Sequence, residues 1–82
     1  MEAMTMADPS TGIKTLREHR EALGWSQVRV AANAGASPVT IGNIERSGGK
    51  DMPWSGELMR RVADALGVKV TDVAEFREVL GL

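Results

Sequence analysis

Apolar residues recur at the spacing of an amphipathic helix in several stretches of the chain. The first stretch predicts a helix over residues 12–23, and Gly24 ends it because glycine readily adopts the backbone conformation of a helix stop. One charged residue shares the inward stripe with the apolar ones. The inward positions are Ile13, Leu16, Arg20 and Leu23.

A second helix is predicted to begin after Ser26, a natural N-cap, and to stop at Gly35. Trp25, just before the cap, can pack on Val30 in a hydrophobic staple that fixes how the chain enters the helix. Local sequence therefore defines this predicted helix at both ends.

A third helix is predicted over residues 38–46, directly after this stop. Ser37 can cap it, and Pro38 takes the first helical position, where its missing N–H costs nothing. A serine and two glycines end it. Gly42 lies at its centre, although glycine inside a helix costs about 1 kcal/mol relative to alanine. The inward positions are Ile41 and Ile44.

Two further helices complete the predicted fold. Ser55 caps a fourth helix that runs to Leu66, with a second staple between Trp54 and Met59. Thr71 caps a short fifth helix. The inward positions are Leu58, Val62 and Leu66 in the fourth helix and Val73, Phe76, Val79 and Leu80 in the fifth.

The predicted class is all-α, because no segment alternates long enough to indicate a strand. We expect a compact five-helix bundle over residues 12–82, preceded by a flexible arm over residues 1–11, which has no periodicity. A chain of 82 residues forms one small domain with a modest core.

Composition excludes several kinds of protein. The chain has no cysteine, so disulfides and thiolate metal sites are absent. No apolar run approaches the roughly 18 residues of a membrane span, and no signal peptide is recognisable, so we expect a cytoplasmic protein without a membrane partner. The net charge is −1, but residues 26–61 carry five Lys or Arg against three Asp or Glu. This locally positive middle section of the chain is a weak indication of nucleic-acid binding.

Catalytic groups are almost lacking. His19 is the only histidine, is expected to be solvated or half-buried, and has no nucleophile signature beside it. One histidine without cysteine does not make a metal site, and Gly48-Gly49 is not followed by the residues of a phosphate loop. We therefore predict no enzyme, no cofactor, no metal and no small-molecule substrate.

The second and third predicted helices are joined by Gly35 and Ala36 alone, so they must cross steeply, as in a helix-turn-helix. The run REALGWSQVRVAANAGASPVTIGNIERSGG, followed by a proline and by LMRRVADALGVKVTDV, resembles the Cro/C1-type helix-turn-helix domain of phage repressors and small bacterial regulators. The resemblance covers roughly residues 13–73. It implies a lambda-repressor-like fold and a sequence-specific transcriptional regulator that binds double-stranded DNA, with helix 38–46 in the major groove.

The resemblance also implies roles for individual residues. Arg20 and Glu45 occupy the positions that the family pairs in a partly buried salt bridge, and Gln27 the position that bonds a DNA phosphate. With Ile41 and Ile44 turned inward, the base-facing positions are Pro38, Val39, Thr40, Gly42 and Asn43. The candidate phosphate contacts are Gln27, Arg29, Arg46 and Lys50.

Side-chain chemistry predicts which bases these positions favour. Asn43 could bond adenine, while Val39 and the Thr40 methyl group could contact thymine methyl groups. No Arg or Lys lies in the base-facing section, so a guanine contact is not expected and the site should lean towards A·T. Two interpretations of Gly42 stay open: it allows close approach to the DNA, or it is a tolerated poor residue at an exposed position.

The chain departs from the family pattern at Val28, where a polar residue is usual, and at Ser47, where glycine is common. These departures bear on the loop geometry and the phosphate contacts, not on the fold. An alternative function is a protein-binding or antitoxin-type module on the same fold, favoured by the near-neutral charge and the apolar Pro38 and Val39, with a toxin or the transcription machinery as partner. A single domain reads few base pairs, so we expect a homodimer on paired half-sites. The candidate dimer interface is Phe76, Val79, Leu80 and Leu82.

Overall fold

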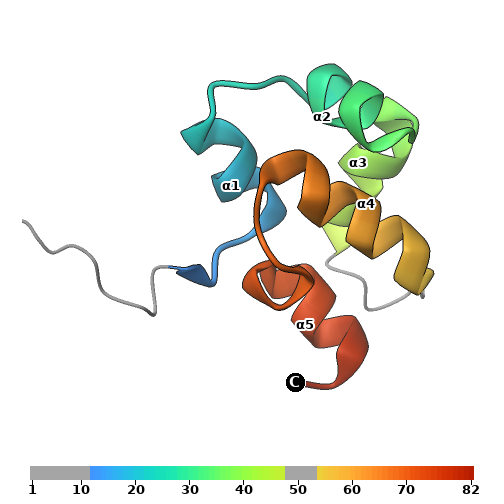
Figure 1. The fold of residues 1–82 in the computed structure, drawn as a ribbon. Helices are drawn as coiled ribbons and strands as arrows, with labels where there is room; N and C mark the ends of the chain where they lie inside the picture. The colour runs from blue at the N-terminus through green and yellow to red at the C-terminus, as the bar shows by residue number, and fades with distance from the viewer. Residues whose placement is uncertain (1–11, 48–53) are drawn as a thin grey trace, which may run out of the picture.

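The structure, a computed structural model, describes residues 12–47 and 54–82, so the predicted arm over residues 1–11 lies outside the described residues. Within these ranges the chain forms five α-helices and a short 3₁₀ helix, η2 (Figure 1). Their bounds are α1 Leu16–Ala22, α2 Gln27–Ala34, α3 Pro38–Ser47, α4 Gly56–Leu66, η2 Val70–Asp72 and α5 Ala74–Leu80.

The predicted all-α class is confirmed. In the described ranges, extended backbone pairs only in one isolated parallel bridge between Lys14 and Val73. The Lys14 N–H donates to the Asp72 carbonyl at 3.0 Å, and the Ala74 N–H donates to the Lys14 carbonyl at 2.8 Å. This bridge ties the segment before α1 to the segment before α5.

Three of the helices begin where local sequence predicts. The hydroxyl oxygens of Ser26, Ser37 and Ser55 each accept the backbone N–H three residues later at 3.1 Å, which caps α2, α3 and α4. Gly35 and Gly67 adopt positive φ at the ends of α2 and α4, as a left-handed helix stop requires. These predictions are confirmed because they depend on neighbours in the sequence.

The predicted start of the first helix is wrong. The helix begins at Leu16 because Thr15 and Glu18 form a capping box, with the Glu18 N–H donating to Thr15 Oγ1 at 3.1 Å and the Thr15 N–H donating to Glu18 Oε1 at 2.9 Å. Ile13 therefore precedes the helix and is exposed, and Leu23, at the other end, is exposed as well. Neither belongs to the core.

The predicted cap of the fifth helix is also wrong. Thr71 lies inside the 3₁₀ helix Val70–Asp72 and does not start an α-helix. The reason is Val73, whose backbone is extended so that it can pair with Lys14, which prevents a helix from running through it. Leu80, which was expected to face inward, is exposed.

The core lies where the five helices meet. Eleven buried residues form it: Leu16, Val30, Ala31, Ala34, Ile41, Ile44, Met59, Val62, Leu66, Val73 and Phe76. Trp25 and Trp54 pack against it, as expected of staple residues. His19 is buried as well, contrary to expectation, and the contact of its Nε2 with the Asp72 carbonyl oxygen at 2.7 Å gives the buried ring nitrogen a hydrogen-bond partner.

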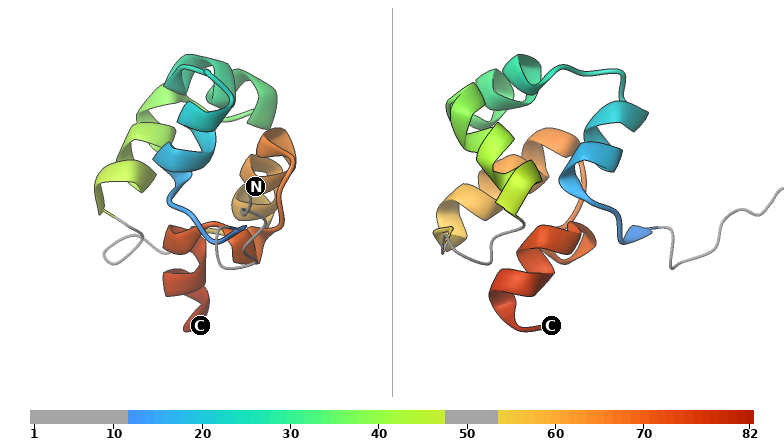
Figure 2. Two further views of the ribbon diagram at one scale, coloured as in Figure 1. Left: turned by 90° about the vertical axis from the view of Figure 1, so that its left-hand side faces the viewer. Right: turned by 180° about the vertical axis from the view of Figure 1, so that it is seen from behind.

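The arrangement separates two ends of the molecule. α2 and α3 lie side by side, and α5 with the C-terminus lies at the end away from α2 in each view (Figure 2). α4 packs against α2 between these ends. A surface on α2 and α3 can therefore contact one partner while α5 contacts another.

Candidate nucleic-acid interface

The candidate interface is built on the α2–turn–α3 unit. Gly35 has a φ of 69°, and the Ala36 N–H donates to the Ala31 carbonyl at 2.9 Å, so the chain reverses within a very short turn. The inner faces of both helices are buried in the same core. The two helices are thus held in one fixed orientation.

An ion pair joins α1 to α3 beneath this unit. Arg20 Nε donates to Glu45 Oε2 at 2.7 Å, and its Nη2 donates to Glu45 Oε1 at 3.2 Å. A third donor, Nη1, reaches the Trp25 carbonyl oxygen at 2.9 Å. The two side chains are only 12% and 7% exposed, so the structure brings Arg20 and Glu45 together in a nearly buried, two-bond pair.

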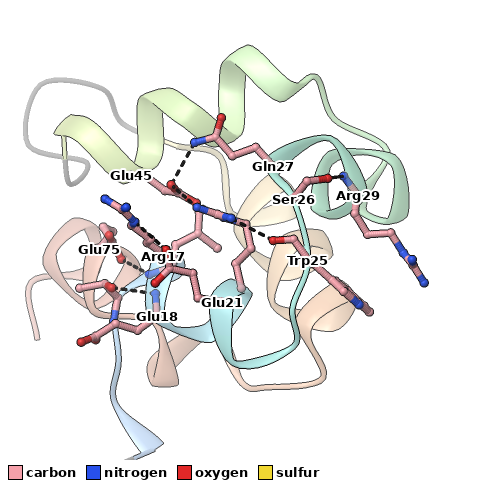
Figure 3. Close-up of polar contacts among 12 residues, drawn as sticks. Arg17, Glu18, Glu21, Trp25, Ser26, Gln27, Arg29, Glu45 and Glu75 are labelled. Atoms are coloured by element: carbon pink, nitrogen blue, oxygen red, sulfur yellow. Dashed lines mark hydrogen bonds and ion pairs between the residues drawn. The ribbon is translucent and has the colours of Figure 1, made fainter.

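Gln27 completes this cluster from the first position of α2. Its Nε2 donates to Glu45 Oε1 at 3.0 Å (Figure 3). A carboxylate can only accept hydrogen bonds, so the amide must turn its NH₂ end towards Glu45. The side chain expected to bind a phosphate therefore also holds α2 to α3, a contact that the sequence did not indicate.

The cluster changes the acid–base behaviour of its members. Burial by itself raises the pKa of the Glu45 carboxyl group, but hydrogen bonds from Arg20 and Gln27 and the charges of Arg20 and Arg17 outweigh it, so the pKa lies below its ordinary value. The hydrogen bond to Glu45 is the main reason that the pKa of Arg20 is raised. Glu45 is therefore held as a carboxylate.

The outer face of α3 presents small and apolar groups. Pro38 is exposed, Val39 is 69% exposed, and Thr40 is half-buried, with its hydroxyl 2.9 Å from that of Ser37. Val28, at the start of α2, is 62% exposed. Two valines thus extend into solvent at the starts of the paired helices.

Gly42 does not lie at an exposed position, so the interpretation of it as a tolerated poor residue at an exposed position is wrong. It is buried, and two side chains cover it. A Cβ atom at this position would lie 3.4 Å from Arg46 Nη1 and 3.6 Å from Gln27 Oε1. The missing side chain therefore leaves room for parts of the protein itself, from α2 and from the next turn of α3.

Among the candidate phosphate contacts in the described ranges, Gln27 and Arg46 both border Gly42, whereas Arg29 packs on Trp25. Arg29 is exposed and stacks its guanidinium group over Trp25, 5.0 Å from the ring centroid. Arg46 turns back along α3 and donates to Asn43 Oδ1. The spacing of these two residues, one helical turn apart, was the only sequence signal for their contact. Lys50 lies outside the described residues.

The candidate dimer interface is wrong in one member. Phe76 is fully buried in the core of a single chain and offers no surface to a second one. Val79 is half-buried, whereas Leu80 is 47% and Leu82 is 66% exposed. Leu82 and Ile13 also line an open hollow of about 350 Å³ beside α5.

The sequence matches a family described as a helix-turn-helix domain over residues 14–76, more than half of the chain. The chain belongs to this family. The match runs from the segment before α1 into α5, and so includes the whole α2–turn–α3 unit. No curated protein and no solved structure matches the chain. None of the helices in residues 12–47 and 54–82 is long and apolar enough to cross a membrane.

Proposed function

We propose that the chain is a sequence-specific transcriptional regulator of the Cro/C1 type that binds double-stranded DNA with α3 in the major groove. One observation carries the proposal: the family's helix-turn-helix is fixed in place by the contacts of Glu45 with Arg20 and Gln27. This leaves the outer face of α3 free for base edges. A helix held this way can read bases without first being ordered.

The start of α2 supports the same proposal. The N–H groups at a helix N-terminus attract phosphate, and α2 begins with Gln27, whose side chain lies at this N-terminus. We propose that Gln27 and Arg29 contact the DNA backbone while Val39, Thr40 and Asn43 face the bases. Gly42 is no longer proposed as a base contact, since Gln27 and Arg46 cover it.

Duplex binding as a function of salt tests this proposal. Binding that neutralises several phosphates gives a log–log salt slope of several units, because each contact releases counterions. Fluorescence anisotropy with random-sequence and selected duplexes, from low to physiological salt, measures this slope. The absence of any duplex binding at low salt would rule out the proposed function.

A second candidate function has one observation in its favour. Val28 and Val39 place two exposed apolar side chains on the face proposed to meet DNA, and the chain as a whole carries a net charge of −1. A protein-binding or antitoxin-type module on the same fold would use these valines against an apolar partner surface. Replacing both with threonine would then weaken the protein complex, whereas a DNA regulator should retain its salt slope.

The proposed regulator acts as a homodimer. Two half-sites on one face of DNA lie about 34 Å apart, and a dimer that joins two copies away from α2 and α3 leaves both recognition helices free. Val79, Leu80 and Leu82 at the α5 end are the proposed contacts, because α5 lies at the end of the molecule away from α2.

A further inference from the structure

Arg46 does not extend beyond the end of α3. Its Nη2 donates to Asn43 Oδ1, and its Nη1 would lie 3.4 Å from a Cβ atom on Gly42. The guanidinium group therefore lies over the preceding turn, at the centre of the helix. Figure 1 shows α3 as a short helix beside α2. Because α3 spans Pro38–Ser47, Gly42 and Asn43 lie in its middle turn.

Gly42 is what makes this conformation possible. Side chains in an α-helix lean towards the N-terminus, so a residue covers the position four places before it. Any side chain longer than a methyl group at position 42 would occupy the space that the Arg46 guanidinium group fills. Gln27 borders the same space, with its Oε1 3.6 Å from the Cβ position. The guanidinium group is thus confined between Asn43 and α2.

The hydrogen bond between Arg46 and Asn43 also changes which donors and acceptors Asn43 can present to a base. Its carbonyl oxygen already accepts a hydrogen bond from Arg46, while its NH₂ group remains a donor. The guanidinium group has only donors. Together the two side chains present a surface dominated by donors. Guanine shows two acceptors in the major groove, O6 and N7, whereas adenine requires one donor and one acceptor from the protein.

We propose that Arg46, held by Asn43 over Gly42, reads guanine in the major groove. This inference rests on the proposed function, and it replaces two expectations from the sequence: an adenine contact by Asn43 and the absence of any guanine contact. The alternative for Arg46 is a phosphate contact, which needs positive charge but not the planar fork of the guanidinium group.

A charge-preserving substitution separates the two roles. Duplexes are first selected from a random pool by the full-length protein, and the guanine whose replacement by adenine weakens binding most is identified. Losing a whole bidentate contact lowers a base preference by about 5- to 150-fold. We expect Arg46→Ala to lower the guanine-over-adenine preference at that position by this factor, and Arg46→Lys to lower it by a smaller factor, because lysine lacks the planar fork of the guanidinium group. The salt slope should change little, because lysine keeps the charge. Arg61→Lys is the control variant: it makes the same substitution at an exposed position on α4 and should leave the guanine preference unchanged.

A second variant tests the space over Gly42. Gly42→Leu should lower the same preference although Arg46 is intact, because the leucine side chain displaces the guanidinium group. Thermal unfolding followed by circular dichroism shows whether each variant is folded. If Gly42→Leu does not fold, Arg46→Lys alone decides, since Arg46 is exposed and its replacement leaves the core untouched.

The outcomes separate the inference from the function on which it rests. A selected site without guanine, or a guanine preference that Arg46→Lys leaves intact, would overturn the inference while duplex binding stands. A reduced salt slope in Arg46→Ala with unchanged base preference would assign Arg46 to a phosphate and overturn it as well. Failure of the wild-type protein to bind any duplex would remove the proposed function and the inference together.

Discussion

Three donors meet at the carboxylate of Glu45: two from Arg20 and one from Gln27. Because these side chains come from α1, α2 and α3, the carboxylate determines how three helices are held relative to one another. A buried charge that loses its partner costs far more than an exposed pair contributes. Among single residues, Glu45 is therefore a position where a substitution should have a large effect on stability.

Glu45→Ala should lower the free energy of unfolding by about 3–5 kcal/mol, because Arg20 is left as an unpaired, nearly buried cation. Urea denaturation measures this loss. Glu57→Ala is the control, since Glu57 pairs with Arg61 at 3.9 Å on an exposed surface and its loss should change stability by less than about 1 kcal/mol. Equal losses in the two variants would contradict the assigned role of the Glu45 carboxylate.

Glu75 has the opposite acid–base behaviour. Burial raises the pKa of this carboxyl group, against the hydrogen bond that its Oε1 accepts from the Leu16 N–H at 2.8 Å. The folded state therefore holds the proton more tightly, and this contribution to stability is present below the ordinary pKa and is lost as the pH rises through the raised one. For Glu45, whose pKa is lowered, the contribution is present above the ordinary value and is lost as the pH falls.

Glu75→Gln should keep or increase stability at pH 7, because the amide oxygen can still accept the Leu16 N–H without a buried charge. Its advantage over the wild type should shrink towards pH 4, where the glutamate is protonated. Denaturation at both pH values measures this trend. Glu75→Ala should instead cost about 1–3 kcal/mol, because the Leu16 N–H loses its acceptor. An advantage of Glu75→Gln that grows as the pH falls would contradict the assignment.

At the scale of the element, the helices differ in what determines their ends. The caps at Ser26, Ser37 and Ser55 involve residues three positions apart, so the sequence alone could predict them. The start of α5 depends on the pairing of Val73 with Lys14, which are far apart in the sequence, so local pattern could not locate it. The Thr15–Glu18 box was visible in the sequence, but the apolar residue Ile13 extended the predicted helix past it.

The glycine in α3 gives a direct test at this scale. Gly42→Ala should raise the free energy of unfolding by about 0.5–1 kcal/mol, because alanine is the better helix former and its Cβ would meet Arg46 Nη1 at an ordinary 3.4 Å. Gly35→Ala is the matched control, since a φ of 69° is strained for alanine and should cost about 1–2 kcal/mol. Thermal unfolding of both variants measures these changes in stability. A loss of stability in Gly42→Ala would show that position 42 has no room for a methyl group.

The candidate site shows the same limit of sequence reasoning. Arg20 and Glu45 could be named together only through the family resemblance, since 25 positions separate them. The burial of Gly42 depends on side chains from α2 and α3, and the contact of Gln27 with Glu45 depends on how these helices cross. Local pattern predicts helices and caps; which side chains meet between helices follows only from the packed structure.

At the scale of the whole molecule, four of the exposed apolar groups lie at two ends. Val28 and Val39 belong to α2 and α3, whereas Leu80 and Leu82 lie at the end of α5. The proposed regulator uses the first pair against DNA and the second against another copy of the chain.

Leu80→Glu should therefore produce a monomer without loss of stability, because Leu80 lies outside the core and a charge at this surface would be buried only in a dimer. Sedimentation velocity at high micromolar concentration, with and without DNA, measures the oligomeric state. Val28→Glu places the same charge on an exposed residue of α2 and, in the absence of DNA, should leave the sedimentation coefficient unchanged. A wild-type protein that is monomeric under both conditions would refute the dimer.

The hydrogen bonds around the start of α1 span nearly the whole chain. The Leu16 N–H is capped by Glu75, 59 positions later, and His19 and Lys14 both bond to the Asp72 carbonyl. During synthesis the first helix is made long before its partners exist, so its N-terminal turn cannot gain them until α5 has left the ribosome. α1 is thus completed only after α5 has been synthesised, and premature termination before Ala74 would leave an unfinished, protease-sensitive product.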